Sequence, residues 1–335
     1  MKVVVTGASG NIGSATLREL TAGGRHEVVG VARRRPELTD RAVAEGSVTW
    51  RSADVGTDDL DAVLEGADAV VHLAWKFQPT HRPDETWRTN AVGTRRLLAA
   101  VRRQRVPALV CASSVAAYSP AHHDDLVDEG WETDGSSPAA YCREKAYNER
   151  VLDAFEASGG GRTRVVRIRP AFVFQRSAAS EQRRIFGGPL LRPRMLDTRL
   201  IPALPVPRGL RLQAVHAEDV ARAVVAAVER PVTGAFNLAG AGVLRREELG
   251  DLVGAPTVEV PPRIVSGALD LGWLAHLVGV PGSLADALLA VPLLATDRAR
   301  AELDWAPRHT AAEAIEAFLS GAAASAGSGM PPLHP

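Results

Sequence analysis

The 335-residue sequence has few cysteines and no excess of either charge. Its two cysteines, Cys111 and Cys142, are too few for a disulfide framework or a cysteine-based metal site, and they suit a reducing compartment. We therefore expect a cytoplasmic protein without a metal. Thirty-nine basic residues balance thirty-nine acidic ones. Without net positive charge there is no general attraction for nucleic acid or an anionic membrane, so we expect neither partner.

The sequence also lacks a long uninterrupted hydrophobic run. The longest apolar tract, residues 267–296, is broken by charged residues, glycine and proline, which favours amphipathic helices over a membrane span. The N-terminus does not resemble a signal peptide, because Met1-Lys2 leads directly into a short strand-like run.

Lysine and tyrosine are scarce as well. Three lysines stand against thirty-six arginines, and there are only three tyrosines, namely Tyr118, Tyr141 and Tyr147. An arginine excess of this kind is typical of a GC-rich genome, so runs of arginine carry little weight. A retained lysine or tyrosine, by contrast, suggests chemistry that arginine or phenylalanine cannot perform.

Hydrophobic residues make up 46% of the chain, enough for a sizeable core. Strand-like runs are expected at 2–6, 26–32, 48–51, 69–73, 108–113 and 164–169. Helical patterns between them cover 12–22, 58–64, 84–103 and 139–157. This alternation predicts an α/β fold, a Rossmann-type doubly wound parallel sheet with helices on both faces.

The pattern changes after residue 169, where prolines interrupt residues 187–209 and helical patterns resume at 218–229 and 245–253. We expect residues 1–170 to form the NAD(P)-binding domain. Residues 171–318 are expected to form mainly a smaller substrate-binding cap, with some return to the first lobe. Residues 319–335 are expected to form a flexible tail.

The first chemical motif is a glycine-rich loop that follows the first predicted strand and opens a helix. It reads Thr6-Gly7-Ala8-Ser9-Gly10-Asn11-Ile12-Gly13. Glycines at these spacings permit a tight turn and a close approach of backbone to a pyrophosphate, which the N-terminus of the helix then binds. The loop predicts a dinucleotide site.

The end of the second strand favours NADP(H) over NAD(H). NAD sites usually carry an acidic residue here, but this chain has Ala32 followed by Arg33 and Arg34. A guanidinium can pair with a 2′-phosphate that an acid would repel. Asp54 and Val55, after the third strand, are placed to contact the adenine.

The third motif is Tyr141-Cys142-Arg143-Glu144-Lys145 on a predicted helix. The i, i+4 spacing puts Tyr141 and Lys145 on one face, and a nearby ammonium can lower the pKa of the phenol toward neutrality. Because both residue types are scarce, a chance pair at this spacing is improbable. Ser113 and Ser114 end the preceding strand and could reach the same reacting oxygen.

These motifs stand in an order that resembles the extended short-chain dehydrogenase/reductases, the NAD-dependent epimerase/dehydratase-like family. The resemblance covers roughly residues 1–318. It rests on Gly7-x-x-Gly10-x-x-Gly13, Asp54-Val55, Val71-His72-Leu73-Ala74, Asn90-x-x-Gly93-Thr94, Ser113-Ser114-x-x-x-Tyr118, Tyr141-x-x-x-Lys145, Arg169-Pro170, Val215-His216-x-x-Asp219 and Leu303-Asp304-Trp305.

The resemblance implies roles for single residues. Tyr141 would be the acid/base, and Ser114 would polarise the substrate oxygen. Lys145 would hold the nicotinamide ribose and lower the pKa of the tyrosine, and Asn90 would support a helix and a proton-relay water. Further cofactor contacts would come from Leu73, Ala74, Pro170 and Phe172.

Departures from the family pattern narrow the expected function. Val115-Ala116 replaces the Asp-Glu pair of sugar-nucleotide dehydratases, and the arginine that grips diphosphate in epimerases is displaced to Arg211. Trp75 and Phe77 suggest an apolar substrate surface. Substrate contacts are accordingly expected from Trp75, Phe77, Gln78, Ser114 and Gln175, with Lys76 and His81 at the mouth and His72 and His216 structural.

These observations favour an NADP(H)-dependent ketone reductase or alcohol dehydrogenase acting on a hydrophobic small molecule, plausibly in secondary metabolism. One alternative is a nucleotide-sugar-type epimerase with tightly bound NAD, in which hydride leaves and returns. Another is a non-catalytic NADP-binding sensor or scaffold. By analogy with the family, a homodimer is expected.

Overall fold

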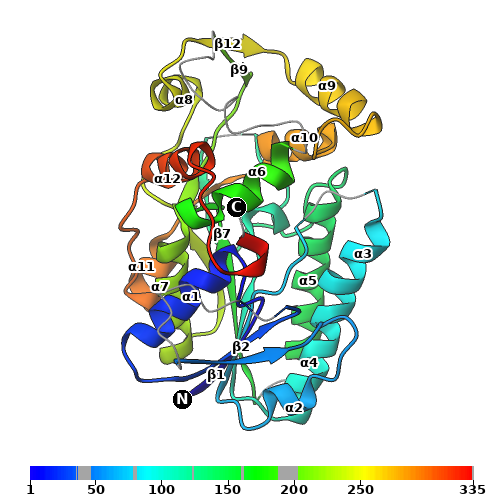
Figure 1. Ribbon diagram of the computed structural model, residues 1–335, viewed down its shortest axis with the longest axis vertical. Helices are drawn as coiled ribbons and strands as arrows, with labels where there is room; N and C mark the ends of the chain where they lie inside the picture. Colours follow the sequence, from blue (N-terminus) through cyan, green and yellow to red (C-terminus); the bar gives the residue numbers. More distant parts are fainter. Residues whose placement is uncertain are drawn as a thin grey trace.

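A parallel β-sheet forms the centre of the larger lobe in the computed structural model, which describes residues 1–34, 36, 47–77, 81–122, 124–159, 162–187 and 203–333 (Figure 1). Within these residues its seven strands lie in the order β11 (Gly234–Leu238), β7 (Arg164–Pro170), β5 (Ala108–Ala112), β4 (Ala69–His72), β1 (Lys2–Thr6), β2 (Glu27–Ala32) and β3 (Val48–Ser52). The expected doubly wound parallel sheet is confirmed. The strand order reverses between β1 and β4, where such sheets open a crevice for ligands.

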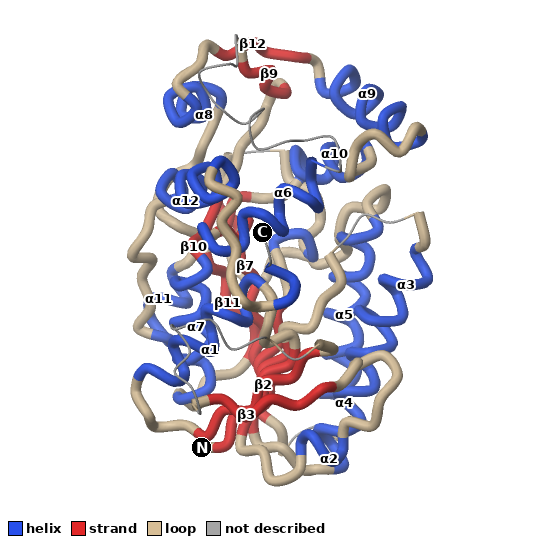
Figure 2. Tube along the Cα trace, viewed as in Figure 1, coloured by secondary structure: helices blue, strands red, loops and turns tan. Residues whose placement is uncertain are grey.

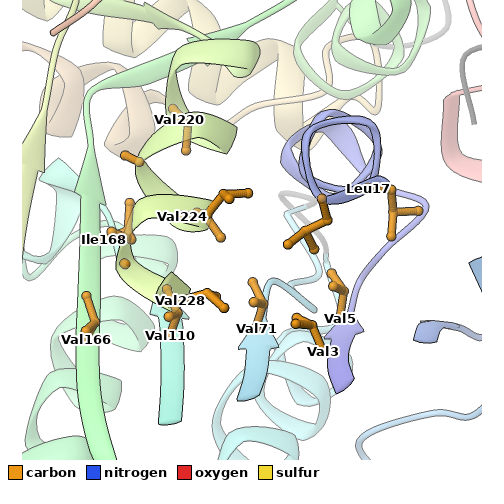
Figure 3. Packing of buried hydrophobic residues seen from close by; sticks show 14 of the residues in the cluster. Val3, Val5, Leu17, Val71, Val110, Val166, Ile168, Val220, Val224 and Val228 are labelled. Carbon is orange, nitrogen blue, oxygen red and sulfur yellow. The ribbon is translucent and has the colours of Figure 1, made fainter. Parts of the chain in front are cut away.

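Alternation along the strands builds the core on both faces of this sheet. Val3 and Val5 of β1 pack toward α1 (Asn11–Ala22) and α7 (Ala217–Glu229), as Figure 3 shows. Val4, between them, belongs to the cluster on the opposite face. That face is covered by α2 (Asp61–Leu64), α4 (Gly93–Arg103) and α5 (Ala140–Ala157).

The helix expected over 84–103 is interrupted. Its first part is α3 (Pro83–Trp87), a π-helical turn follows at Arg88–Val92, and α4 completes it. Such turns are frequently found at functional sites, because the extra residue redirects side chains. Here the turn carries Asn90.

A smaller lobe lies beyond the carboxyl ends of the strands, at the top of Figures 1 and 2. It contains a two-stranded parallel sheet of β9 (Leu204–Pro207) and β12 (Thr257–Val260). Its helices are α6 (Ala179–Gly187), α8 (Arg246–Val253), α9 (Pro262–Leu274) and α10 (Gly282–Ala290). Two short pairs, β8 (Phe172–Phe174) with β10 (Ala214–His216) and β6 (Leu126–Val127) with β13 (Leu293–Leu294), lie in the same half. No helix of the described chain is both long and apolar enough to cross a membrane.

The C-terminal segment differs from the flexible tail expected over 319–335. After α11 (Asp297–Leu303), the helix α12 (Ala311–Ala323) runs past residue 319, and a 3-10 turn follows at Pro331–Leu333. Met330 and Leu333 are buried in the same cluster as the strand valines. A few apolar side chains thus anchor this segment, although its Gly- and Ser-rich sequence suggested a loose end.

Candidate active site

A cavity of about 640 Å³ lies along the carboxyl ends of the strands and extends beneath the smaller lobe. It brings together most of the residues expected at the site from widely separated parts of the sequence. These are Gly7, Ser9, Gly10, Asn11, Ile12, Gly13, Arg33, Asp54, Val55, Leu73, Ala74, Trp75, Phe77, Ser114, Tyr141, Lys145, Pro170 and Phe172.

The glycine-rich loop forms one end of the cavity. Gly7 has φ +71°, and a Cβ there would lie 2.5 Å from the backbone nitrogen of Ala74. A Cβ on Gly13 would lie 2.8 Å from the carbonyl carbon of Ala8. At Gly10 the protein leaves room, since the sole neighbour within 4 Å is the carbonyl oxygen of Gly7 at 3.4 Å. Two glycines therefore set the loop's shape, while the third leaves bare backbone facing the cavity.

Arg33 and Asp54 flank the same end. Arg33 follows β2, is exposed and lines the cavity, whereas Arg34 is exposed without lining it. Asp54 follows β3 and turns one carboxylate oxygen to the backbone N–H of Gly56, at 2.8 Å. Both cavity-lining side chains stand at the strand ends, where the sequence predicted the adenosine part of a dinucleotide.

Ser114, Tyr141 and Lys145 meet at the middle of the cavity. Ser114 ends the β5 segment, and its Oγ accepts a hydrogen bond from the N–H of Ala116 at 3.1 Å, which leaves the hydroxyl proton available. Tyr141 hydrogen-bonds Ser114. Lys145 donates to the carbonyl of Ala112 at 2.9 Å. Its ammonium lies 3.5 Å from the Trp75 ring centre but 5.9 Å from that of Tyr141.

The expected lowering of the pKa of Tyr141 by Lys145 does not occur in this structure. Burial raises the pKa of Tyr141 above its ordinary value, and the hydrogen bond to Ser114 offsets only part of that rise. Burial also lowers the pKa of Lys145 to about 7, against the opposing charge of Glu149. The phenol is thus held protonated at neutral pH, which is the form that donates a proton.

Ser113, the other serine of the pair, is occupied elsewhere. Its Oγ donates to the Glu149 carboxylate at 2.6 Å, and both side chains are buried. Arg169 donates twice to Glu149, at 2.9 Å each, and Arg167 lies 3.1 Å from it. Both serines line the cavity, but this network occupies the hydroxyl proton of Ser113, whereas that of Ser114 is available to a bound molecule.

Asn90 lies behind the cavity wall. Its Oδ1 accepts from the backbone N–H of Lys76 at 2.7 Å, and its Nδ2 donates to the Lys76 carbonyl and to Glu144. The side chain therefore clamps the loop that carries Trp75 and Phe77. The catalytic role expected for Asn90 becomes a positioning role, because its amide is fully buried and spent on these contacts.

Aromatic rings surround the phenol of Tyr141. Trp75 and Phe77 meet it edge to face, at 5.8 Å and 4.5 Å between ring centres, and Phe77 continues to Phe186 of α6 at 5.6 Å. Beyond them the wall is aliphatic, formed by Val265 and Leu269 of α9 and by side chains of α10 such as Leu284 and Leu288. This end of the cavity suits an apolar molecule.

One expected substrate contact is not found, and another cannot be located. Gln175 lies outside the cavity lining, because its Nε2 donates to the carbonyl and side chain of Asn11 while its Oε1 accepts from Arg18. It secures the start of α1, so the substrate role is wrong for this geometry. Gln78 lies outside the described residues.

Other residues singled out in the sequence have identifiable contacts. His72 is buried between the hydroxyls of Thr6 and Thr94, and His216 caps the N-terminus of α7. Arg211 is buried and donates to the Ala121 carbonyl. Lys76 lines the cavity and pairs with Glu85. His81 stacks on Trp273 of α9 at 3.8 Å between ring centres, which joins the two lobes near the mouth.

Sequence reasoning missed the residues that α6 contributes. Glu181, Gln182, Ile185 and Phe186 all line the cavity. Their spacing is that of one face of a helix. That signal was present in the sequence, but the prolines that follow obscured the helix.

The comparisons with known proteins agree with this geometry. The model of the NAD dependent epimerase/dehydratase family matches residues 3–239. The chain belongs to that family. The matched residues include the glycine-rich loop, the helix that carries Tyr141 and Lys145, and nearly all of the central sheet.

Curated relatives of this epimerase/dehydratase family member are distant. An uncharacterized protein of Mycobacterium tuberculosis is 26% identical over 322 residues, which cover 95% of this chain but 30% of that protein. The chain thus spans about a third of the length of these mycobacterial relatives. A 4-hydroxy-2-methyl-3-oxo-4-farnesyl-3,4-dihydroquinoline-1-oxide ketoreductase of Stigmatella aurantiaca is 28% identical, with 99% of each chain covered.

Solved structures share the fold. The UDP-glucose-4-epimerase of Stenotrophomonas maltophila, with bound NAD and formylated UDP-arabinopyranose, has a TM-score of 0.73 and 22% identity, covering 97% of this chain and 98% of that one. At this identity the likeness concerns the fold alone.

Proposed function

We propose that this protein is an NADP(H)-dependent ketone reductase or alcohol dehydrogenase that acts on a hydrophobic small molecule. The observation that carries the proposal is the phenol of Tyr141, which is hydrogen-bonded to Ser114 and enclosed by Trp75 and Phe77. A proton donor inside an apolar wall suits the reduction of a carbonyl group. The full-length match to a ketoreductase supports the same reaction class.

The residues at the other end of the cavity fit a dinucleotide. Bare backbone at Gly10 and the N-terminus of α1 can face a pyrophosphate, and Arg33 can pair with a 2′-phosphate. Since Ala32 stands where an acid would select NAD, we propose NADP(H) as the cofactor, although the solved neighbour has bound NAD. When bound, the cofactor supplies the hydride that reduces the carbonyl carbon, or accepts it in the reverse direction.

The protein's own part is proton transfer and positioning. Tyr141 gives its phenolic proton to the carbonyl oxygen as negative charge develops there, and the product is an alcohol. The hydroxyl of Ser114 donates a hydrogen bond to the same oxygen, while the aromatic wall excludes water. In alcohol oxidation the tyrosinate accepts the proton. Lys145, fixed on the Ala112 carbonyl, presents a polar group beside the phenol.

The substrate end does not suit a sugar nucleotide. Among the described residues no arginine lines it, and Arg211, which might have gripped a diphosphate, is bonded to Ala121. Diphosphate recognition normally uses such cationic forks. This favours a ketone reductase over the epimerase that the fold equally permits.

Replacing Tyr141 with phenylalanine tests the proposal. Tyr141→Phe keeps the ring packing but removes the proton donor, so we expect kcat for NADPH-dependent ketone reduction to fall about 10²–10⁴-fold. Tyr147→Phe is the matched control, because Tyr147 lies on the same helix and packs on Trp87 outside the cavity. Unchanged turnover in Tyr141→Phe would refute the proposal.

The alternatives give other results. An epimerase would purify with NAD(H) and convert its substrate without net consumption of NADPH. A non-catalytic sensor would bind NADPH tightly and reduce no member of a broad panel of ketones.

A further inference from the structure

Glu181 is an acidic side chain in the apolar half of the cavity. It lies on α6 and lines the cavity with Gln182, Ile185 and Phe186. Within the described part of the chain, its carboxylate has no hydrogen-bond or salt-bridge partner. Arg184, one turn further on, acts on it through its charge but donates to the Pro332 carbonyl at 3.1 Å.

The position of Glu181 relative to the reacting group follows from a chain of contacts. Tyr141 touches Phe77, and Phe77 touches Phe186 on the same face of α6 as Glu181. Glu181 precedes Phe186 by five residues, about 7.5 Å along the helix axis. The carboxylate therefore lies on the cavity wall that α6 forms, about one and a half turns before Phe186, where a substrate arm that extends along α6 from the carbonyl would pass.

The surroundings make an unpaired carboxylate costly. Val265, Leu269, Leu284 and Leu288 line the same end of the cavity, and burial raises the pKa of Glu181 to about 7. Glu181 is partly buried, and a carboxylate on an apolar cavity wall without a partner among the described residues is explained by a ligand that supplies the missing group.

We propose that Glu181 determines substrate specificity, and that the substrate is an apolar ketone or alcohol carrying a protonated amine. The inference rests on the proposed reductase function and names its substrate class. The carboxylate accepts hydrogen bonds from the ammonium group, while the aliphatic walls bury the rest of the molecule. A charge-assisted pair of this kind is about twice as strong as a neutral hydrogen bond.

The other charges at this end agree with a cationic arm. Lys145 lies over the Trp75 ring and donates to the Ala112 carbonyl, and Lys76, the residue after Trp75, is paired with Glu85. A carboxylate or phosphate on the substrate would meet the like charge of Glu181, and Arg184, which acts on Glu181 through its charge, donates to the Pro332 carbonyl. A neutral apolar arm would leave Glu181 without a hydrogen-bond partner among the described residues.

Three phenyl ketones of similar size can test this charge preference. β-Dimethylaminopropiophenone carries an ammonium, isocaprophenone carries an uncharged branched carbon at the same place, and β-benzoylpropionate carries a carboxylate. Binding is measured by calorimetry with and without NADP⁺, and reduction is followed separately with NADPH. We expect the ammonium ketone to bind at least about 10-fold more tightly than its neutral isostere.

Variants assign the preference to one side chain. Glu181→Gln keeps the shape but removes the charge, so the affinity ratio of ammonium to neutral ketone should fall about 10-fold. Glu316→Gln, an exposed change on α12, should leave the ratio at its original value. In the original protein the ratio should also rise with pH through about 7, where Glu181 ionises.

The outcomes separate this inference from the proposed function. Preferential binding of the ammonium ketone without any reduction would support Glu181 and refute the reductase. Reduction of all three ketones with no charge preference, or with a ratio that Glu181→Gln leaves intact, would overturn the role of Glu181 and leave the reductase standing. Failure of all three ketones to bind would also overturn it.

Discussion

Two glutamates, Glu149 fully buried and Glu181 partly buried, show how the two lobes differ. Burial alone would raise the pKa of Glu149 in the sheet lobe, but hydrogen bonds from Arg169 and Ser113 and the charge of Arg167 lower it to about 2. Glu181, in the smaller lobe, lacks such partners among the described residues, and burial raises its pKa to about 7. A glutamate is thus a paired anion that stabilises the fold in one lobe, whereas in the other lobe a glutamate is available to accept hydrogen bonds from a ligand.

The difference extends to the elements that carry these residues. In the sheet lobe, the glycine-rich loop packs closely against neighbouring backbone, Glu149 is paired with Arg169, and Asn90 is hydrogen-bonded to Glu144. These contacts form without a ligand. In the smaller lobe, α9 buries none of its residues and exposes Leu271 and Leu274. A nucleotide-binding lobe needs one fixed shape, whereas the lobe that covers the substrate can vary with it.

The largest expected effect comes from breaking the Glu149 network. Glu149→Gln leaves Arg169 buried beside a neutral amide, so we expect the free energy of unfolding at pH 7 to fall by about 3–5 kcal/mol. Because the folded pKa lies below the unfolded one, Glu149 stabilises the protein above about pH 4.5, and this contribution is lost as the pH falls toward about 2. Urea unfolding across this range measures both effects.

Glu181→Gln is the matched comparison and should behave oppositely. Its folded pKa is raised, so its favourable contribution exists below about pH 4.5 and disappears as the pH rises to about 7. At pH 8 the variant should therefore be more stable than the original by about 1–2 kcal/mol, after allowance for solvent screening. If the free energy of unfolding of the two variants depended on pH in the same way, the proposed difference between the two lobes would be contradicted.

A second comparison uses glycines. Gly13→Ala places a Cβ against the backbone of Gly7 and Ala8, and we expect a loss of about 3 kcal/mol in stability together with loss of NADPH binding. A Cβ at Gly267, in α9, would meet no described atom within 4 Å outside the backbone of its own helix, so Gly267→Ala should stabilise the protein by up to about 1 kcal/mol. Thermal unfolding and NADPH fluorescence measure the pair. If Gly13→Ala changed neither the stability nor NADPH binding, the close packing of the loop at Gly13 would be contradicted.

The last comparison concerns cofactor choice. Arg33→Ala removes the guanidinium that faces the cavity, so the KM for NADPH should rise about 10–100-fold while the KM for NADH changes little. Arg34→Ala, an exposed neighbour outside the cavity, should raise it less. Steady-state kinetics with both cofactors decides the matter, and equal effects on NADPH and NADH would contradict a 2′-phosphate contact.

Much of the sheet lobe could be predicted because its signals are local. β-Branched strands, the spacing of Gly7, Gly10 and Gly13, and the Tyr141–Lys145 turn each depend on neighbours within a few residues. The residues at the substrate end of the cavity were harder to predict from the sequence, because their contacts come from distant positions. The sequence predicts a substrate contact for Gln175, but its amide donates to the carbonyl of Asn11, which is 164 positions away.

The sequence by itself determined the fold class, the nucleotide-facing loop and the identity of the Ser114, Tyr141 and Lys145 set. Tertiary structure decided the electrostatics of that set. The pKa of Tyr141 rises because the side chain is buried beside Trp75 and Phe77, which lie in the segment after β4. The ammonium of Lys145 lies over the Trp75 ring and is further from the Tyr141 ring. Burial and charge depend on every neighbour in space, so only the packed chain could show a protonated tyrosine and an unpaired Glu181 in one cavity.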